Sequence, residues 1–115
     1  MHNGYVDTGS GRKSLAAAVG GANDLGAVNG LVTIQAFLAT NPTYTIHYRV
    51  APNGTTPGNT LALFGAQGCI THLGAAEFNT PPEGAHLWII ITEPTLHVPV
   101  VGGAADALYV QLHRR

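Results

Sequence analysis

The sequence predicts an all-β fold: a single antiparallel β-sandwich, jelly-roll-like domain or small barrel of about seven short strands. Short runs rich in β-branched and aromatic residues recur along the chain, and clusters of glycine and proline separate them at regular intervals. No run has the length and period of a long helix. With 115 residues, the chain is long enough for one domain with one hydrophobic core.

Residues 1–29 differ from the rest, because they contain six glycines and few large apolar side chains. Ser14 could cap a single helical turn that ends at Gly20 and Gly21, or the segment could be extended. Fixing a residue costs roughly 1–2 kcal/mol of backbone entropy, which so little apolar burial would not offset. We therefore expect a Gly-rich N-terminal arm, held by a neighbouring molecule rather than by the domain's own sheet edge. Residues 30–115 would form the β domain.

The β pattern begins after Gly30, with a strand over residues 31–39 that ends before Asn41 and Pro42. The next predicted strand, residues 43–50, alternates clearly. Its core face would carry Tyr44, Ile46, Tyr48 and Val50, and its other face Thr43, Thr45, His47 and Arg49. This second face is polar, and Arg49 is its only full charge.

The remaining elements follow from turn signals and hydrophobic runs. They are a loop over residues 51–59, short strands over residues 60–64 and 69–73, a loop over residues 74–84, a strand over residues 86–92, and a hairpin of residues 96–101 and 107–113 around a five-residue loop. The strand at residues 86–92 is the most hydrophobic. We expect it to be central and buried on both faces.

Charge is unusually sparse, because residues 25–76 carry one charged side chain, Arg49. An average soluble sequence would place roughly thirteen charges in such a stretch. The cores of protein interfaces are depleted in charge, and arginine is enriched at their energetic centres. We therefore expect a partner to cover this surface. The interface candidates are Tyr5, Arg12, Leu15, Val19, Thr43, Thr45, His47 and Arg49.

The overall charge argues against two classes of partner. The formal net charge is −1, and Lys13 is the only lysine, so the chain lacks the basic surface that nucleic acids or anionic membranes require. The longest apolar run, residues 87–91, is too short to span a bilayer. The N-terminus has no basic and apolar leader, so outside a virion we expect a cytoplasmic protein.

Residues that could carry chemistry are present but scattered. The histidines at positions 47, 72, 86 and 97, with Cys69 and Glu77, lack the spacing of a zinc site. Cys69 is expected to be a buried thiol. Cys69 and His72 should face opposite ways on a strand, which argues against a catalytic dyad. Nothing brings two carboxylates together. We expect no catalytic residues, cofactor or metal, although a small metal-dependent enzyme remains an alternative.

A carbohydrate- or small-ligand-binding β module is the other alternative. Polar, uncharged faces suit sugars, and Tyr44, Tyr48 and Trp88 could supply aromatic stacking. Tyr44 and Tyr48 share a face with Ile46 and Val50, however, so packing in the core is the competing interpretation.

In composition and layout, the chain resembles the small decoration or cement proteins of bacteriophage heads, with residues 1–29 as the arm and residues 30–115 as the β body. The resemblance implies a structural virion protein whose arm clamps neighbouring subunits. Its partners would be copies of itself, a major capsid protein or another structural protein. Deleting residues 1–29 should then leave a folded body that no longer assembles. Replacing Arg49 with alanine should weaken assembly more than folding.

Overall fold

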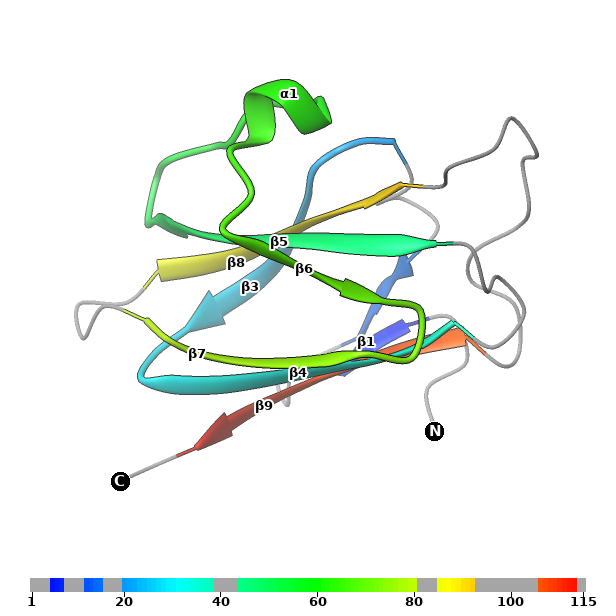
Figure 1. The fold of residues 1–115 in the computed structure, drawn as a ribbon. Coiled ribbons are helices and arrows are strands. Elements are labelled where there is room, and N and C mark those ends of the chain that lie inside the picture. The colour runs from blue at the N-terminus through cyan, green and yellow to red at the C-terminus, as the bar shows by residue number, and fades with distance from the viewer. Residues whose placement is uncertain are drawn as a thin grey trace.

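The computed structural model describes residues 5–7, 12–15, 20–38, 44–80, 85–92 and 106–113, and its strands form two facing layers (Figure 1). One sheet has the strand order β2-β1-β9-β4-β7, and the other has the order β3-β8-β5-β6. The elements are β1 (Tyr5–Asp7), β2 (Arg12–Ser14), β3 (Asn23–Val28), β4 (Leu31–Leu38), β5 (Thr45–Pro52), α1 (Leu61–Phe64), β6 (Gly68–Thr71), β7 (Ala75–Asn79), β8 (Ala85–Thr92) and β9 (Asp106–His113).

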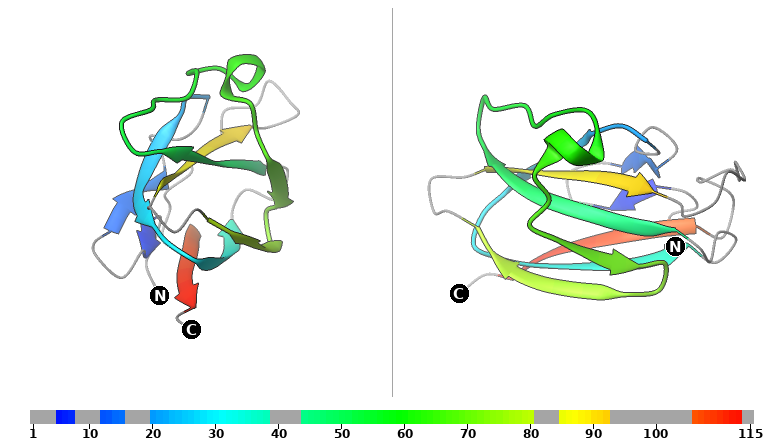
Figure 2. Two further views of the ribbon diagram at one scale, coloured as in Figure 1. Left: turned by 90° about the vertical axis from the view of Figure 1, so that its left-hand side faces the viewer. Right: turned by 45° about the horizontal axis from the view of Figure 1, so that its top comes forward.

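The described strands pair antiparallel except for β1 and β9, which run parallel. The predicted all-β, sandwich-like fold is therefore confirmed. The chain changes sheet at a turn between β6 and β7, where the Gly74 amide donates to the Thr71 carbonyl over 2.9 Å. This turn keeps β6 in one layer and β7 in the other, as the two views of Figure 2 show.

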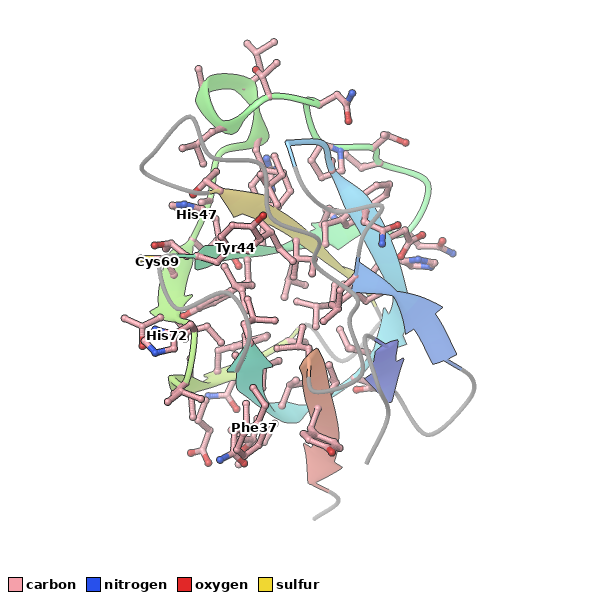
Figure 3. All side chains as sticks on the ribbon, turned by 90° about the vertical axis from the view of Figure 1, so that its right-hand side faces the viewer. Phe37, Tyr44, His47, Cys69 and His72 are labelled. Carbon is pink, nitrogen blue, oxygen red and sulfur yellow. The ribbon has the colours of Figure 1, made fainter. Side chains whose placement is uncertain are left out.

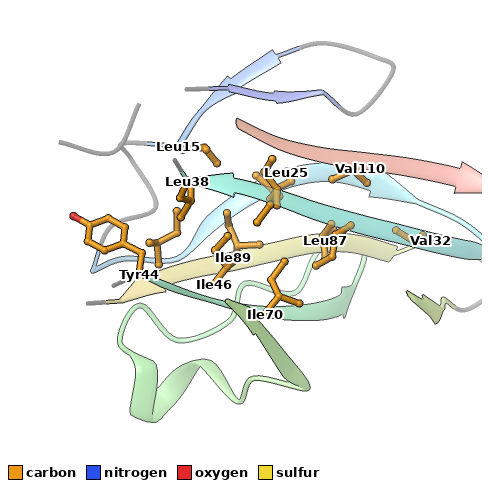
Figure 4. Close-up of a cluster of buried hydrophobic side chains, with 14 of the residues drawn as sticks. Leu15, Leu25, Val32, Leu38, Tyr44, Ile46, Ile70, Leu87, Ile89 and Val110 are labelled. Atoms are coloured by element: carbon orange, nitrogen blue, oxygen red, sulfur yellow. The ribbon is translucent and has the colours of Figure 1, made fainter. Parts of the chain in front are cut away.

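The core fills the space between the two sheets (Figure 4). Side chains of β4 alternate between buried and less buried positions, and so do those of β8 over Ala85–Ile89, as the period of a strand requires. Tyr48 of β5 stacks on Phe78 of β7, with ring centroids 4.9 Å apart, and so links the two layers. The core consists of Leu15, Leu25, Val28, Val32, Ile34, Ala36, Leu38, Tyr44, Ile46, Ile70, Leu87, Ile89, Ile91, Leu108 and Val110.

The expectation of a separate arm is wrong for the described part of residues 1–29. Strand β3 completes the four-stranded sheet by pairing with β8, and β1 and β2 extend the five-stranded sheet beside β9. Leu15 is fully buried, and Leu25 is 1% exposed. The segment has few apolar residues, but it places them in the common core, so the domain itself supports it.

The predicted strand over residues 60–64 is also wrong, because Leu61–Phe64 forms the short helix α1. Thr60 caps the helix, with its hydroxyl oxygen accepting from the Leu63 amide at 3.4 Å. Gly65 ends it with φ +70°, a left-handed conformation that glycine adopts without steric cost. The caps at both ends therefore favour a helix, although the apolar residues between them had predicted a strand.

The predicted loop over residues 74–84 contains strand β7, which pairs along β4 from Leu31 to Gln35. The expected central strand is confirmed, because β8 lies between β3 and β5. Its inner face is buried in the core, and Ile90 is buried on the opposite face. Strand β9 is confirmed too, but its described partners are β1 and β4. The other half of the predicted hairpin, residues 96–101, lies outside the described residues.

Candidate interaction surface

The polar face predicted for residues 43–50 is the outer face of the four-stranded sheet. Tyr44 and Ile46 are buried in the core, so Thr45, His47 and Arg49 lie on the opposite side of β5. The sheet register gives each of these residues a cross-strand neighbour. Thr45 pairs with Thr71 and Thr92, His47 with Cys69 and Ile90, and Arg49 with Trp88.

The chain between β5 and β6 covers the Arg49 end of this face. The Arg49 guanidinium donates from Nη1 to the Phe64 carbonyl oxygen over 2.9 Å, at the end of α1. Phe64 is fully buried and Pro57 is buried, although neither belongs to the core between the sheets. Residues 53–67, which we call the cap segment, therefore bury two side chains outside the core, and α1 projects from the sheet in Figure 1.

Two further side chains fasten the cap segment. Gln67 makes two hydrogen bonds to β5. Its backbone amide donates to the Tyr48 carbonyl at 2.9 Å, and its side-chain Oε1 accepts from the Val50 backbone amide at 3.0 Å. Asn59 Oδ1 accepts from the Ala22 amide at 2.8 Å. The middle of the cap segment is thus tied to the chain just before β3, and its C-terminal end is tied to β5.

The other end of the face is neutral and polar. His47 Nε2 lies 2.9 Å from the Thr92 hydroxyl on β8, and burial lowers the pKa of His47 from its ordinary value of 6.5. The imidazole is therefore uncharged at neutral pH. Cys69 lies opposite His47 on β6 and is exposed, which corrects the expectation of a buried thiol. Figure 3 shows His47, Cys69 and His72 along this side of the molecule.

Charge on this sheet is concentrated near β3. Asp24 Oδ1 and Oδ2 lie 3.0 and 2.9 Å from His86 Nδ1, and Asp24 Oδ1 also accepts from the Gly26 amide at 2.8 Å. Trp88 lies between Asp24 and Arg49 in the register, and its buried Nε1 has no hydrogen-bond partner within the described structure. The Asp24 carboxylate therefore makes its hydrogen bonds at the β3 edge of the sheet, to His86 and Gly26.

The other interface candidates are not described on this face. Tyr5 lies in β1 and Arg12 in β2. Leu15 is fully buried in the core, so its side chain packs against its own chain and is no longer an interface residue. Val19 and Thr43 lie outside the described residues. The structure therefore places Thr45, His47 and Arg49 on one sheet face, away from Leu15.

The histidines do not gather into a metal centre in the described part of the chain, where no group of three or more His, Cys, Asp or Glu side chains could hold an ion. His47 and His86 lie on different strands, and His72 lies in the turn after β6. His97 lies outside the described residues. Glu77 Oε2 accepts from the Thr33 hydroxyl at 3.4 Å, and both residues belong to the five-stranded sheet. Among the described residues, no helix is long and apolar enough to cross a membrane.

Sequence reasoning missed two surface features. Phe37 of β4 and Tyr109 of β9 form an edge-to-face ring pair on the outer face of the five-stranded sheet, with centroids 5.7 Å apart. The alternation of β4 contained this signal, because Phe37 lies on the opposite side from Ala36 and Leu38. The apolar side chains of Leu61 and Leu63 on α1 are exposed, and they were hidden by the prediction of a strand there.

Comparison with known proteins yields no match: no family model, no curated protein and no solved structure matches this chain.

Proposed function

We propose that this protein is a non-enzymatic structural assembly subunit that associates with copies of itself and belongs to the surface layer of a virion, in the manner of a phage-head decoration protein. The observation that carries the proposal is the bond from Arg49 to Phe64. It engages the only charged side chain of residues 25–76 within the domain itself. Apart from Arg49, whose charge is directed at the end of α1, the strands β5 and β6 and the helix α1 carry no charged side chain.

A neutral surface of this kind suits burial against a partner. The exposed side chains include Leu63, which is 70% exposed, and Leu61, which is 44% exposed. Hydroxyl groups such as that of Thr71 can be buried at low cost once they are hydrogen-bonded, whereas an unpaired ion cannot. A solitary soluble domain gains nothing from so little surface charge, because net and local charge keep domains dispersed.

The role of residues 1–29 in this proposal changes. A chain that lacks them loses β3 and the buried side chains of Leu15, Leu25 and Val28. We therefore expect the shortened chain not to fold. It cannot serve as the test of assembly.

The mass of the native particle tests the proposal. Mass photometry and light scattering of the purified chain, over a range of concentrations, should give masses above that of the monomer. Because neutral groups form the proposed contact, raising the salt concentration should not dissociate the particle. A chain that stays monomeric up to its solubility limit would overturn the proposal. Detection of the chain by mass spectrometry in purified virus particles from its source would test the virion setting.

A carbohydrate-binding module is the second candidate, and the Phe37–Tyr109 pair favours it. The aromatic residues first considered are not suited to it, because Tyr44 is 1% exposed and Tyr48 stacks on Phe78. Phe37 and Tyr109 instead lie near Gln35, which is exposed and opposite Tyr109 in the register. Saturable binding on a glycan array that is lost in Phe37→Ala, in a chain that remains monomeric, would favour this function over assembly.

A further inference from the structure

The sandwich has four outermost strands, β2 and β7 in one sheet and β3 and β6 in the other. Each of them pairs with a described strand on one side only. An outermost strand offers unpaired backbone donors and acceptors to any extended chain that approaches it. Proteins usually guard such edges with charges, prolines or bulges.

Three of the four edges carry such a guard. Strand β2 contains Arg12 and Lys13, and β7 contains the exposed Glu77. Strand β3 contains Asp24 and a register shift between Asp24 and Gly26 that interrupts its pairing with β8. Strand β6, Gly68-Cys69-Ile70-Thr71, has no charge and no proline, and it pairs with β5 in regular register at four successive positions.

We propose that β6 is the site at which a second copy of this chain joins, with the two β6 strands pairing antiparallel about a twofold axis. The two four-stranded sheets would then form one continuous eight-stranded sheet. This inference rests on the proposed self-assembly and specifies its surface. In Figure 1, β6 runs along the side of the sandwich that faces the viewer, with no described element in front of it.

The chemistry of β6 favours a second copy over a different partner. Around a twofold axis each residue meets its own counterpart or a close neighbour of it, so any charge near the axis would face an identical charge. Strand β6 avoids this conflict, because its exposed side chains, Cys69 and Thr71, carry no charge.

Strand geometry restricts the register of the pair. A twofold axis perpendicular to the sheet keeps the outer face of each copy outside, so residues of the same face must lie opposite each other. Among these registers, the two that pair three of the four residues of β6 place Cys69 opposite Cys69 of the other copy, or Ile70 opposite Ile70. In either register the two exposed thiols lie within a separation of about 8 Å.

The thiols therefore supply a direct test in the full-length chain. Mild oxidation or a short bifunctional thiol reagent should link two copies through Cys69, and Cys69→Ser should remove the link but keep the native mass. Cys69→Lys places two positive charges opposite each other and should raise the dissociation constant of the dimer at least about tenfold. Gln35→Lys adds the same charge at an exposed strand position of the other sheet and serves as the control.

The outcomes separate this inference from the proposed function. Loss of the dimer in Cys69→Lys but not in Gln35→Lys, with unchanged far-ultraviolet circular dichroism of both variants, supports β6 pairing. A wild-type oligomer that Cys69→Lys leaves intact, and that thiol reagents do not link, overturns β6 pairing but leaves self-assembly standing. A wild-type monomer at all concentrations overturns both.

Discussion

The Arg49 guanidinium donates a hydrogen bond to the carbonyl oxygen of Phe64, fifteen residues later in the chain, over 2.9 Å. The bond joins the middle of β5 to the end of α1, where the last carbonyl groups of a helix have no partner within the helix. A positive charge is favourable at this end. Arg49 therefore acts within the domain, and the cap segment depends on it.

Replacing Arg49 with alanine should loosen the cap segment and destabilise the fold. The Phe64 carbonyl would lose its charged donor, and such a bond contributes about 1–2 kcal/mol at a partly buried site. This expectation reverses the first one, that assembly would suffer more than folding. Urea denaturation should show the loss, and hydrogen exchange should accelerate at residues 61–67. Arg49→Lys should recover part of the stability, because an ammonium group can also donate. Unchanged exchange in Arg49→Ala would contradict the role of this bond.

Gly65 gives an independent measure of how closely Arg49 packs. A Cβ atom at Gly65 would lie 2.9 Å from Arg49 Nη1, and the backbone there has φ +70°. Gly54 has φ +85° with open space around it, so Gly54→Ala reports backbone strain alone. We expect Gly65→Ala to destabilise by about 1–2 kcal/mol and Gly54→Ala by about 1 kcal/mol in urea denaturation.

A double-mutant cycle completes this measurement. In an Arg49→Ala background, the clash at Gly65 is absent, so the two glycine variants should cost the same. Equal costs in the wild-type background as well would show that Arg49 does not pack against Gly65.

Much of the fold was readable from the sequence because its strands bury one face. The alternation of β5 placed Tyr44 and Ile46 inside and His47 outside, as the structure has them. The hydrophobic run of β8 predicted its central position. Strand β7 was not predicted, because only two of its side chains, Ala76 and Phe78, pack against the core, and both are only partly buried.

The candidate surface was harder to predict because it depends on contacts between distant residues. Spacing along the sequence could test only whether Cys69 and His72 face the same way on one strand. The sheet register instead places Cys69 opposite His47. The bond from Arg49 to Phe64 depends on α1, where a strand was predicted, and the helix is capped by Thr60 and Gly65. Leu15 and Leu25 were assigned to an arm, because their glycine-rich surroundings concealed two core side chains.

Leu25 and Leu63 provide a matched pair that tests the corrected place of the N-terminal segment. Leu25 is 1% exposed in the core, whereas Leu63 is 70% exposed on α1. Leu25→Ala should destabilise by about 2–5 kcal/mol, because it leaves a cavity between the sheets. Leu63→Ala should change stability by less than about 0.5 kcal/mol. Chemical denaturation measures both. Similar small effects would mean that residues 20–28 are not integral to the core.

His47 should make stability depend on pH below neutrality. Burial lowers its pKa in the folded chain below the ordinary value of 6.5, so the unfolded chain binds more protons between the two values. The free energy of unfolding should therefore fall as the pH drops below about 6.5 towards the pKa of folded His47. Above about pH 6.5 it should have its full value. Protonation also obliges Nε2 to donate, so the Thr92 hydroxyl must then accept the bond.

His47→Gln isolates this effect, because glutamine retains a polar group near Thr92 but does not titrate. Free energies of unfolding for both proteins should be measured from pH 5 to pH 8. At pH 8, where both proteins are neutral at position 47, the difference between them reports packing and hydrogen bonding alone. The difference should shift in favour of the variant as the pH falls through about 6.5. Parallel pH profiles for the two proteins would show that the folded environment of His47 does not disfavour its charged form.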